Sequence, residues 1–193
     1  MNTKLQGKDF INIGVFTAIY FVVIFAVAML GVIPVFIPLI SVFVPLVGGI
    51  PMMLYFSKIK KLGMLTITGL LTGILMLLTG MGYWCILTGA VFGFLADLML
   101  KGSGYKNAKR EILAYGVFSI WNIGAFIPII FSRDSYYAML VSYAKTDYAD
   151  ALMRYMPDWI APILVAACFV FGILGGILGQ KIFKKHFARA GVV

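Results

Sequence analysis

Charged side chains are scarce in this chain. Only 12% of its 193 residues are Asp, Glu, Lys or Arg, whereas 62% are hydrophobic, and the mean hydropathy is +1.01. A soluble domain carries roughly 25% charged residues because its surface faces water. Half that share excludes an ordinary soluble domain and indicates a surface that faces lipid.

Residues that carry common catalytic and metal chemistry are equally rare. The chain has 7 acidic residues, 1 histidine and 2 cysteines. Cys85 and Cys168 lie inside apolar runs, which is typical of inert packing thiols and not of a disulfide or metal site. The sequence shows no carboxylate pair, Cys/His cluster, Walker-type loop or nucleophile elbow. We therefore predict that the chain is not an enzyme, holds no metal or cofactor of its own, and does not itself hydrolyse ATP.

Long apolar segments fill most of the chain. A helix needs about 20 apolar residues to cross a hydrocarbon core about 30 Å thick. We therefore predict an all-α integral membrane protein with a single transmembrane domain over residues 1–193. Its six predicted transmembrane helices cover residues 10–31, 33–56, 62–79, 83–100, 112–131 and 159–183. The second span contains Pro34, Pro38, Pro45 and Pro51, so we expect it to be broken by proline.

The distribution of basic residues predicts the orientation. The chain has 16 Lys and Arg residues and a formal net charge of +9. With six spans and a cytoplasmic N-terminus, only Arg133, Lys145 and Arg154 fall outside. The other basic residues fall inside, namely Lys4, Lys8, Lys58, Lys60, Lys61, Lys101, Lys106, Lys109, Arg110, Lys181, Lys184, Lys185 and Arg189. Because cytoplasmic loops are rich in Lys and Arg, we predict cytoplasmic N- and C-termini, contact of this charge with anionic membrane lipid, and no nucleic-acid partner.

The predicted external loop between spans five and six, residues 132–158, is long and rich in tyrosine and methionine. Its apolar and aromatic residues recur at spacings of three and four, which is typical of an amphipathic helix lying against the membrane face. Loops of this length without a role are uncommon in compact domains. We interpret the loop as a lid over an outward-facing pocket.

Small residues recur four apart in several spans. In the third, fourth and sixth spans we expect such glycines to pack helices inside the chain, because close backbone approach drives helix association in lipid. The first span is more open to interpretation. Its stripe of Gly14, Ala18 and Ala26 could pack internally or could bind a separate membrane subunit.

Asp97 lies well inside the predicted fourth span. A charge at mid-membrane costs about 2.5–3.5 kcal/mol on insertion scales. Because Asp97 lies four residues before Lys101, we expect an ion pair near the cytoplasmic end of the span to lower that cost. A proton relay is the alternative, but it would need a second ionisable partner within the spans. The predicted spans contain no other carboxylate and no histidine, which argues against ion-coupled transport.

Aromatic and polar residues near the outer ends of the spans form the candidate substrate site, which consists of Tyr83, Trp84, Trp121, Asn122, Arg133, Asp134, Tyr136, Tyr137 and Trp159. A mainly apolar pocket with few polar anchors is usual for a small-molecule site. The alternatives are structural. Tyr83, Trp84 and Trp159 could belong to an interfacial aromatic belt, and Asn122 could hydrogen-bond a neighbouring helix.

Four stretches of the chain resemble the Trep_Strep family: KDFINIGVFTAIYFVV, GMGYWCILTGAVFGFLADLMLK, AYGVFSIWNIGAFIPIIFSRDSYY and GGILGQKIFKKHFARAG. Members are also described as MptD-like substrate-binding (S) components of energy-coupling factor (ECF) transporters, a class of ABC importer. The resemblance implies a six-helix S-component bundle in the bacterial plasma membrane that captures a vitamin or other micronutrient outside the cell.

The partners implied by the resemblance are a transmembrane coupling (T) protein and two ATPase subunits, which would hydrolyse the ATP that drives uptake. S components of other families contact the coupling protein through an Ala-xxx-Ala-like stripe on the first helix, and Gly14 and Ala18 fit that pattern with glycine in the first place. The aromatic and methionine-rich outer face suits a flat conjugated ligand such as haem or another tetrapyrrole.

Two other functional classes fit the sequence. One is a free-standing secondary transporter or channel. Many such folds contain inverted repeats, and no clear internal repeat is visible in this chain. The other is a membrane scaffold without a small ligand, whose outer loop binds a partner protein.

Overall fold

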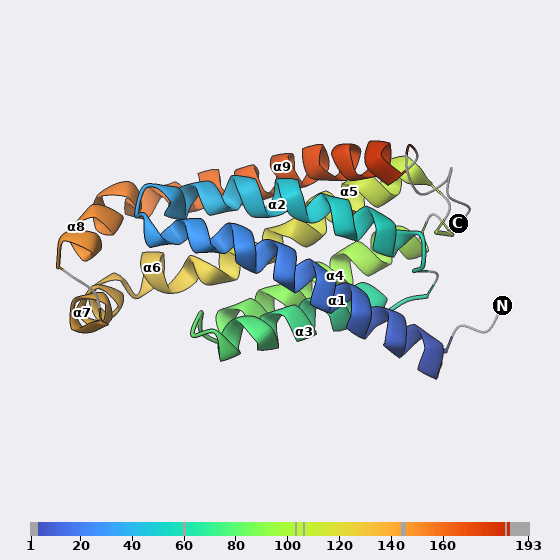
Figure 1. The fold of residues 1–193 in the computed structure, drawn as a ribbon, viewed down its shortest axis with the longest axis horizontal. Helices are drawn as coiled ribbons and strands as arrows, with labels where there is room; N and C mark the ends of the chain where they lie inside the picture. The colour runs from blue at the N-terminus through green and yellow to red at the C-terminus, as the bar shows by residue number, and fades with distance from the viewer. Residues whose placement is uncertain are drawn as a thin grey trace.

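The computed structural model describes residues 4–59, 61–102, 104–105, 107–143, 146–183 and 185, and every regular element within them is helical. In chain order the elements are α1 (Gly7–Ala28), η1 (Met29–Val32), α2 (Phe36–Phe56), α3 (Met64–Leu78), α4 (Trp84–Lys101), α5 (Ala108–Ser119), η2 (Ile120–Ala125), α6 (Ile127–Phe131), α7 (Arg133–Tyr143), α8 (Thr146–Tyr155), η3 (Asp158–Ile160) and α9 (Ala161–Ile182). The start of α1 and the end of α9 lie at one end of an elongated bundle, and α7 and α8 lie at the other (Figure 1).

Among the described residues, four helical stretches are long and apolar enough to cross a membrane: Gly7–Val32, Phe36–Phe56, Trp84–Lys101 and Asp158–Ile182. The third predicted span corresponds to α3, a shorter apolar helix of 15 residues. The fifth predicted span is divided into α5, η2 and α6. The chain is thus an all-helical membrane protein with four candidate spans, and the count of six stays a prediction.

The second span is one continuous helix, α2, so the prediction of a proline-broken span is wrong. Pro34 precedes the helix, and Pro38 lies in its first turn, where the nitrogen needs no intrahelical acceptor. Pro45 and Pro51 lie in the interior, where each removes one backbone donor. Membrane helices tolerate such prolines when neighbouring helices pack against them. Both interior prolines are buried, and the Tyr115 hydroxyl donates to the Pro45 carbonyl oxygen at 2.7 Å.

The fifth predicted span contains the interruption instead. The α-helix α5 ends at Ser119, a 3-10 segment follows, and α6 begins with Pro128 at its second position. Pro128 lies in the first turn of α6, where its missing backbone donor needs no intrahelical acceptor. The Thr88 hydroxyl of α4 donates to the Trp121 carbonyl oxygen at 2.7 Å. A side chain from a neighbouring helix therefore satisfies a backbone group in the interrupted segment.

Glycine backbones bring α3 against α4 and α2 against α9. A β-carbon on Gly69 would lie 2.1 Å from the carbonyl oxygen of Gly89, and one on Gly49 would lie 2.2 Å from the carbonyl group of Gly175. These separations leave no room for a side chain at any of the four positions. Close approach through small residues drives helix association in lipid. The predicted packing role of glycine in the third, fourth and sixth spans is confirmed.

Asp97 is buried in α4 and caps the neighbouring helix α3. Its Oδ2 accepts hydrogen bonds from the Gly63 nitrogen at 3.1 Å, the Thr66 nitrogen at 2.8 Å and the Thr66 hydroxyl at 2.7 Å, and its Oδ1 accepts from the Leu65 nitrogen at 3.3 Å. The first backbone donors of a helix have no intrahelical acceptors and favour a nearby negative charge. The predicted structural role is confirmed, but the predicted partner Lys101 is wrong, because the buried carboxylate bonds to Gly63, Leu65 and Thr66 instead.

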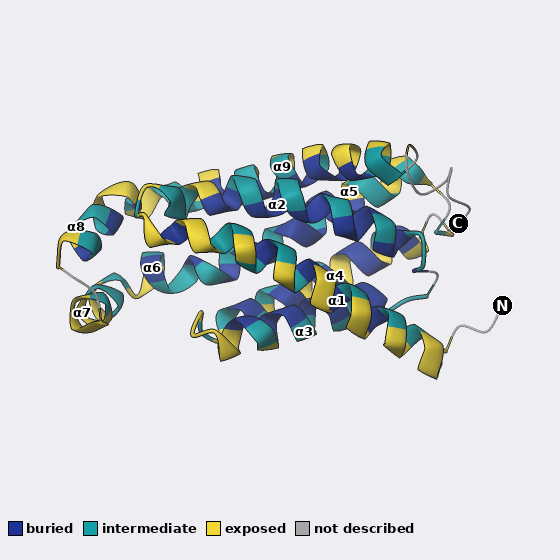
Figure 2. Cartoon of the chain, in the orientation of Figure 1, coloured by how far each residue is buried: buried dark blue, intermediate teal, exposed yellow. Residues whose placement is uncertain are grey.

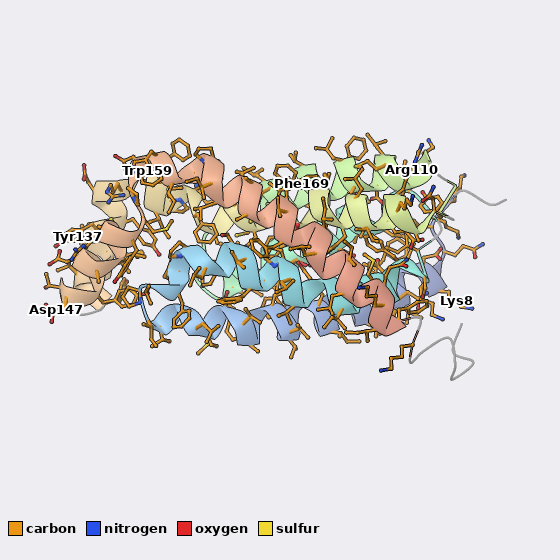
Figure 3. All side chains as sticks on the ribbon, turned by 90° about the horizontal axis from the view of Figure 1, so that it is seen from above. Lys8, Arg110, Tyr137, Asp147, Trp159 and Phe169 are labelled. Carbon is orange, nitrogen blue, oxygen red and sulfur yellow. The ribbon has the colours of Figure 1, made fainter. Side chains whose placement is uncertain are left out.

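Basic residues at the start of α1 and α5 lie at the end of the bundle opposite the cap. Figure 3 shows Lys8 and Arg110 at one end and Tyr137, Asp147 and Trp159 at the other. This separation agrees with the basic connections predicted from the sequence. Five of the basic residues used to predict the orientation lie outside the described residues: Lys60, Lys106, Lys145, Lys184 and Arg189.

Gly69→Ala is predicted to destabilise the protein, because the added methyl group would force α3 and α4 apart. Overpacking costs about 1–3 kcal/mol, which exceeds the roughly 1 kcal/mol that alanine gains over glycine within a helix. We expect a lower melting temperature in detergent, measured by size exclusion of heated samples. Gly14→Ala is the control, since nothing lies within 4 Å of its β-carbon position. Equal melting temperatures for the two variants would contradict the packing argument.

Candidate functional site

Two short helices, α7 and α8, cap one end of the bundle. In Figure 1, α7 is seen nearly end-on, so it lies across the direction of the long helices. It buries none of its residues, whereas α8 buries Ala149 and Leu152 and exposes Asp147 and Asp150. Met156, just after α8, is also buried. The single amphipathic helix predicted for this loop is therefore two helices, of which α8 turns its apolar face toward the bundle.

Arg133 holds the end of α8. Its guanidinium donates from Nη2 to the Met153 carbonyl oxygen at 2.6 Å, and from Nη1 to the Met156 carbonyl oxygen and to the Asp158 carboxylate, the latter at 3.2 Å. The last carbonyl groups of a helix lack intrahelical donors, so a cation placed there both satisfies them and favours the helix dipole. Arg133 therefore joins the start of α7 to the end of α8 and to η3.

Two tyrosine hydroxyls add bonds on the cap. Tyr137 of α7 donates to the Asp150 carboxylate of α8 at 2.8 Å, and Tyr148 of α8 donates to the Gly31 carbonyl oxygen at 2.7 Å. The hydrogen bond to Asp150 raises the pKa of Tyr137, and burial raises the pKa of Tyr148. Both hydroxyls therefore keep their protons, and act as donors, at neutral pH.

An open polar depression lies beside the cap, with a volume of about 570 Å³. Its lining consists of Ile130, Phe131, Ser132, Arg133, Asp134, Ser135 and Asp158. The depression brings together two of the predicted substrate residues, Arg133 and Asp134. The guanidinium already bonds to the cap, so carboxylate and hydroxyl oxygens provide the free polar groups. Such a surface can accept hydrogen bonds from a polar ligand.

Trp121 and Asn122 lie in the core below the cap and not in the depression. Trp121 is 1% exposed, and its indole N–H donates to the Tyr20 hydroxyl at 2.9 Å. Asn122 is 3% exposed, and its amide nitrogen lies 3.5 Å from the Ile40 carbonyl oxygen. These contacts join η2 to α1 and α2, as expected for polar groups that bond between membrane helices. Their predicted substrate role stays a prediction.

The remaining aromatic candidates are distributed around the periphery. The rings of Tyr83 and Trp84 stack with centroids 5.0 Å apart at the start of α4, and Tyr83 is 57% exposed. Figure 1 shows the connection between α3 and α4 apart from α7 and α8. Trp159 of η3 is 67% exposed, and Tyr136 of α7 is half-buried. The structure does not gather these four residues into a single pocket with Arg133.

Several residues that define the cap were not singled out from the sequence, among them Tyr148, Asp150 and Asp158. A signal existed for the buried face of α8, because Ala149, Leu152 and Met156 recur at helical spacing. Periodicity identifies such a buried face, but it does not identify the part of the chain that packs against it. The partner of Tyr148, the Gly31 carbonyl group, lies 117 residues away in sequence.

The predicted partner-binding residues lie on the exposed face of α1. Gly14, Ala18 and Ala26 are all exposed, and nothing lies within 4 Å of a β-carbon position on Gly14. The same face exposes the larger side chains Ile11, Val15, Val22 and Met29. The opposite face packs into the bundle through Ile13, Thr17, Tyr20 and Ile24. Figure 2 shows the exposed and buried bands alternating along α1. The stripe therefore does not serve packing within the chain.

An apolar groove of about 220 Å³ adjoins this face. It lies among α1, α2 and α9 and is lined by Ile19, Val23, Ile50, Pro51, Leu54, Gly179, Ile182 and Phe183. Ile19 and Val23 continue, at intervals of four residues, the row of Ile11 and Val15 along α1, so the groove continues the exposed face. Its lining offers shape and apolar contact without polar chemistry.

Arg133→Gln is predicted to loosen the cap. Hydrogen bonds to charged groups contribute about 1.5–3 kcal/mol, and the partly exposed guanidinium places this case at the low end. We expect chymotrypsin to cleave within α8 roughly tenfold faster, since 1.4 kcal/mol corresponds to a factor of ten. Arg154→Gln makes the same change at an exposed position of α8 and is the control. Equal cleavage rates for the two variants would contradict the clamp.

A family model matches almost the whole chain. The model, described as "Hypothetical bacterial integral membrane protein (Trep_Strep)", covers residues 7–189. No curated protein and no solved structure matches the chain. The matched region includes every helix from α1 to α9, together with the cap and the exposed face of α1. The chain therefore belongs to the Trep_Strep family of hypothetical bacterial integral membrane proteins.

Proposed function

We propose that this chain is the substrate-binding (S) component of an ECF-type ABC importer in the bacterial plasma membrane. It captures a micronutrient at the external face and docks on a transmembrane coupling protein with two ATPase subunits, which hydrolyse the ATP. Membership in a membrane-protein family and the small all-helical fold support this assignment. The sequence motifs that bind ATP are absent from the chain itself, so an energy source in partner subunits fits the proposal.

In this proposal the chain crosses the membrane six times, with both termini in the cytoplasm. The segments α3 and α5–η2–α6 run along the same axis as the four candidate spans (Figure 1), and they supply the other two crossings. The basic residues near the start of α1 and the end of α9 then face the cytoplasm, as the charge bias of membrane proteins favours. The cap formed by α7 and α8 faces outside.

The observation that carries the proposal is the exposed face of α1. A helix that served only the internal packing of a small bundle would turn its small residues inward, because small residues allow close backbone approach. Here Gly14, Ala18 and Ala26 face outward, while Tyr20 and Ile24 face inward. An outward stripe of small residues suits a second membrane helix. The adjoining apolar groove extends the surface available to that helix.

Ala18→Trp is predicted to abolish co-purification with the coupling protein and the two ATPases. An indole at the centre of the stripe would hold the partner helix away, whereas Ala18 is exposed and does not pack within the chain. Ala166→Trp places the same side chain at an exposed position of α9 and should leave the complex intact. Affinity purification from cells that express all subunits, followed by quantification of each subunit, makes the measurement. Loss of the complex in both variants, or in neither, would count against docking through α1.

Substrate capture is proposed at the capped end, where the polar depression and the tyrosine-rich cap lie together. We expect a thermal-shift screen of vitamins, cofactors and haem against the purified chain to yield a ligand that binds below micromolar concentration. Such a ligand stabilises the folded state by about 2.7 kcal/mol at one hundred times its dissociation constant. No hit among these compounds would favour a membrane scaffold. Gradient-driven uptake by the chain alone in liposomes would instead indicate a secondary transporter.

A further inference from the structure

The bonds of the cap form two groups with different consequences. Arg133 and Tyr137 of α7 bond to Met153, Met156 and Asp150 in and just after α8. These bonds lie within the cap and join its two helices. No residue of α7 is fully buried, although Tyr136 and Leu140 are partly buried against the hydrophobic core. The two helices are therefore held to each other by polar bonds on their facing sides.

Apart from the chain connections and the exposed ion pair between Arg133 and Asp158 of η3, the attachment of the cap to the bundle lies on α8. Ala149, Leu152 and Met156 form its buried apolar face, at 0%, 1% and 0% exposure. The side-chain hydrogen bond from α8 to the long helices within the described residues is that of Tyr148 to the Gly31 carbonyl oxygen, at 2.7 Å. An apolar contact without direction can slide or separate, whereas a hydrogen bond fixes a position. The Tyr148 bond therefore determines where α8 rests.

The acceptor of this bond belongs to the end of α1. Gly31 is buried in η1, the 3-10 turn that directly continues α1. A β-carbon there would lie 2.8 Å from the Ile37 side chain and 3.2 Å from the Ile40 side chain, so η1 packs tightly against the start of α2. Ala26, on the exposed face of α1, precedes it by five residues, and the exposed Met29, the first residue of η1, precedes it by two. The position of the Gly31 carbonyl group thus follows any tilt or rotation of α1.

We propose that the Tyr148–Gly31 hydrogen bond is a latch that keeps the cap closed and couples the cap to α1. Cap opening breaks this bond and moves α7 and α8 together, while the bonds within the cap persist. The coupling to a partner rests on the proposed function, in which that partner docks on α1. Such coupling is reciprocal, because a partner that favours the open position binds more tightly to an open cap.

The latch can be tested on the full isolated chain in liposomes. Ala149→Cys places a thiol on the buried face of α8 with a small change in volume, and its reaction with a membrane-impermeant maleimide reports cap opening. Tyr148→Phe and Tyr137→Phe are a matched pair, since each removes one hydroxyl and one hydrogen bond of similar length. A hydrogen bond contributes about 0.5–1.5 kcal/mol, so Tyr148→Phe should speed labelling about two- to tenfold. Tyr137→Phe should leave the rate unchanged.

The parent chain provides the control for folding. Cys85 and Cys168 are both buried in the bundle, so their labelling stays slow unless the whole protein unfolds. Faster reaction at all three thiols in Tyr148→Phe would overturn the latch, because it would indicate general unfolding. An unchanged rate at position 149 would also overturn it. Equal acceleration by Tyr137→Phe would show that the bonds within the cap, and not the Gly31 contact, govern opening.

A second measurement separates the coupling from the proposed function. The labelling rate of Ala149→Cys is compared between the isolated chain and the chain assembled with the coupling protein and ATPases. We expect the labelling rate to change at least twofold in the complex. We also expect the chains with Tyr148 and with Tyr148→Phe to be labelled at the same rate there. A complex that forms without any change in rate would overturn the coupling. Failure to form a complex refutes the proposed function, whereas the isolated chain alone decides whether the latch exists.

Discussion

Contact between glycine backbones positions the rest of this molecule. In lipid, apolar side chains gain nothing by leaving the solvent, so helices associate through close packing and hydrogen bonds. Gly69 against Gly89 and Gly49 against Gly175 bring two pairs of helices to backbone contact. The same close packing of α3 and α4 includes Gly93, next to Leu65 and Thr66, and brings the carboxylate of Asp97 to the first turn of α3. The cap of α3 thus follows from the packing and does not produce it.

The buried polar groups extend this arrangement across the bundle. An unsatisfied polar group in hydrocarbon costs several kcal/mol. Hydrogen bonds between polar groups on different helices avoid that cost. Tyr20 accepts the indole N–H of Trp121, and Tyr115 donates to the Pro45 carbonyl oxygen. These bonds link α1 with η2 and α5 with α2. They explain how an interrupted fifth segment and a helix with interior prolines lie within one bundle.

Hydropathy and spacing determined which segments are helical and which glycines pack, because both depend on local composition. The predicted third span, 62–79, agrees closely with α3 (Met64–Leu78). The number of prolines wrongly predicted a break in α2. Whether a helix with interior prolines stays continuous depends on the helices that pack against it, which the local sequence does not reveal. The signal for the true interruption was present as Asn122, Gly124 and Pro128 in one short stretch. The site was harder to predict, because Arg133 and Tyr148 bond to backbone carbonyl groups, which every residue carries.

Two kinds of contact therefore meet in α1. Along its length, α1 is held by close packing of its buried face, which includes Tyr20. A close-packed interior has few alternative arrangements, so this contact resists small displacements. At its end, η1 accepts the hydrogen bond of Tyr148 from the cap, and the free energy of such a bond is small enough for thermal fluctuations to break it often. In the proposed latch, a displacement of α1 by a partner would therefore reach the cap through the contact of Gly31 with Tyr148. That contact lies at the end of the molecule where the depression opens.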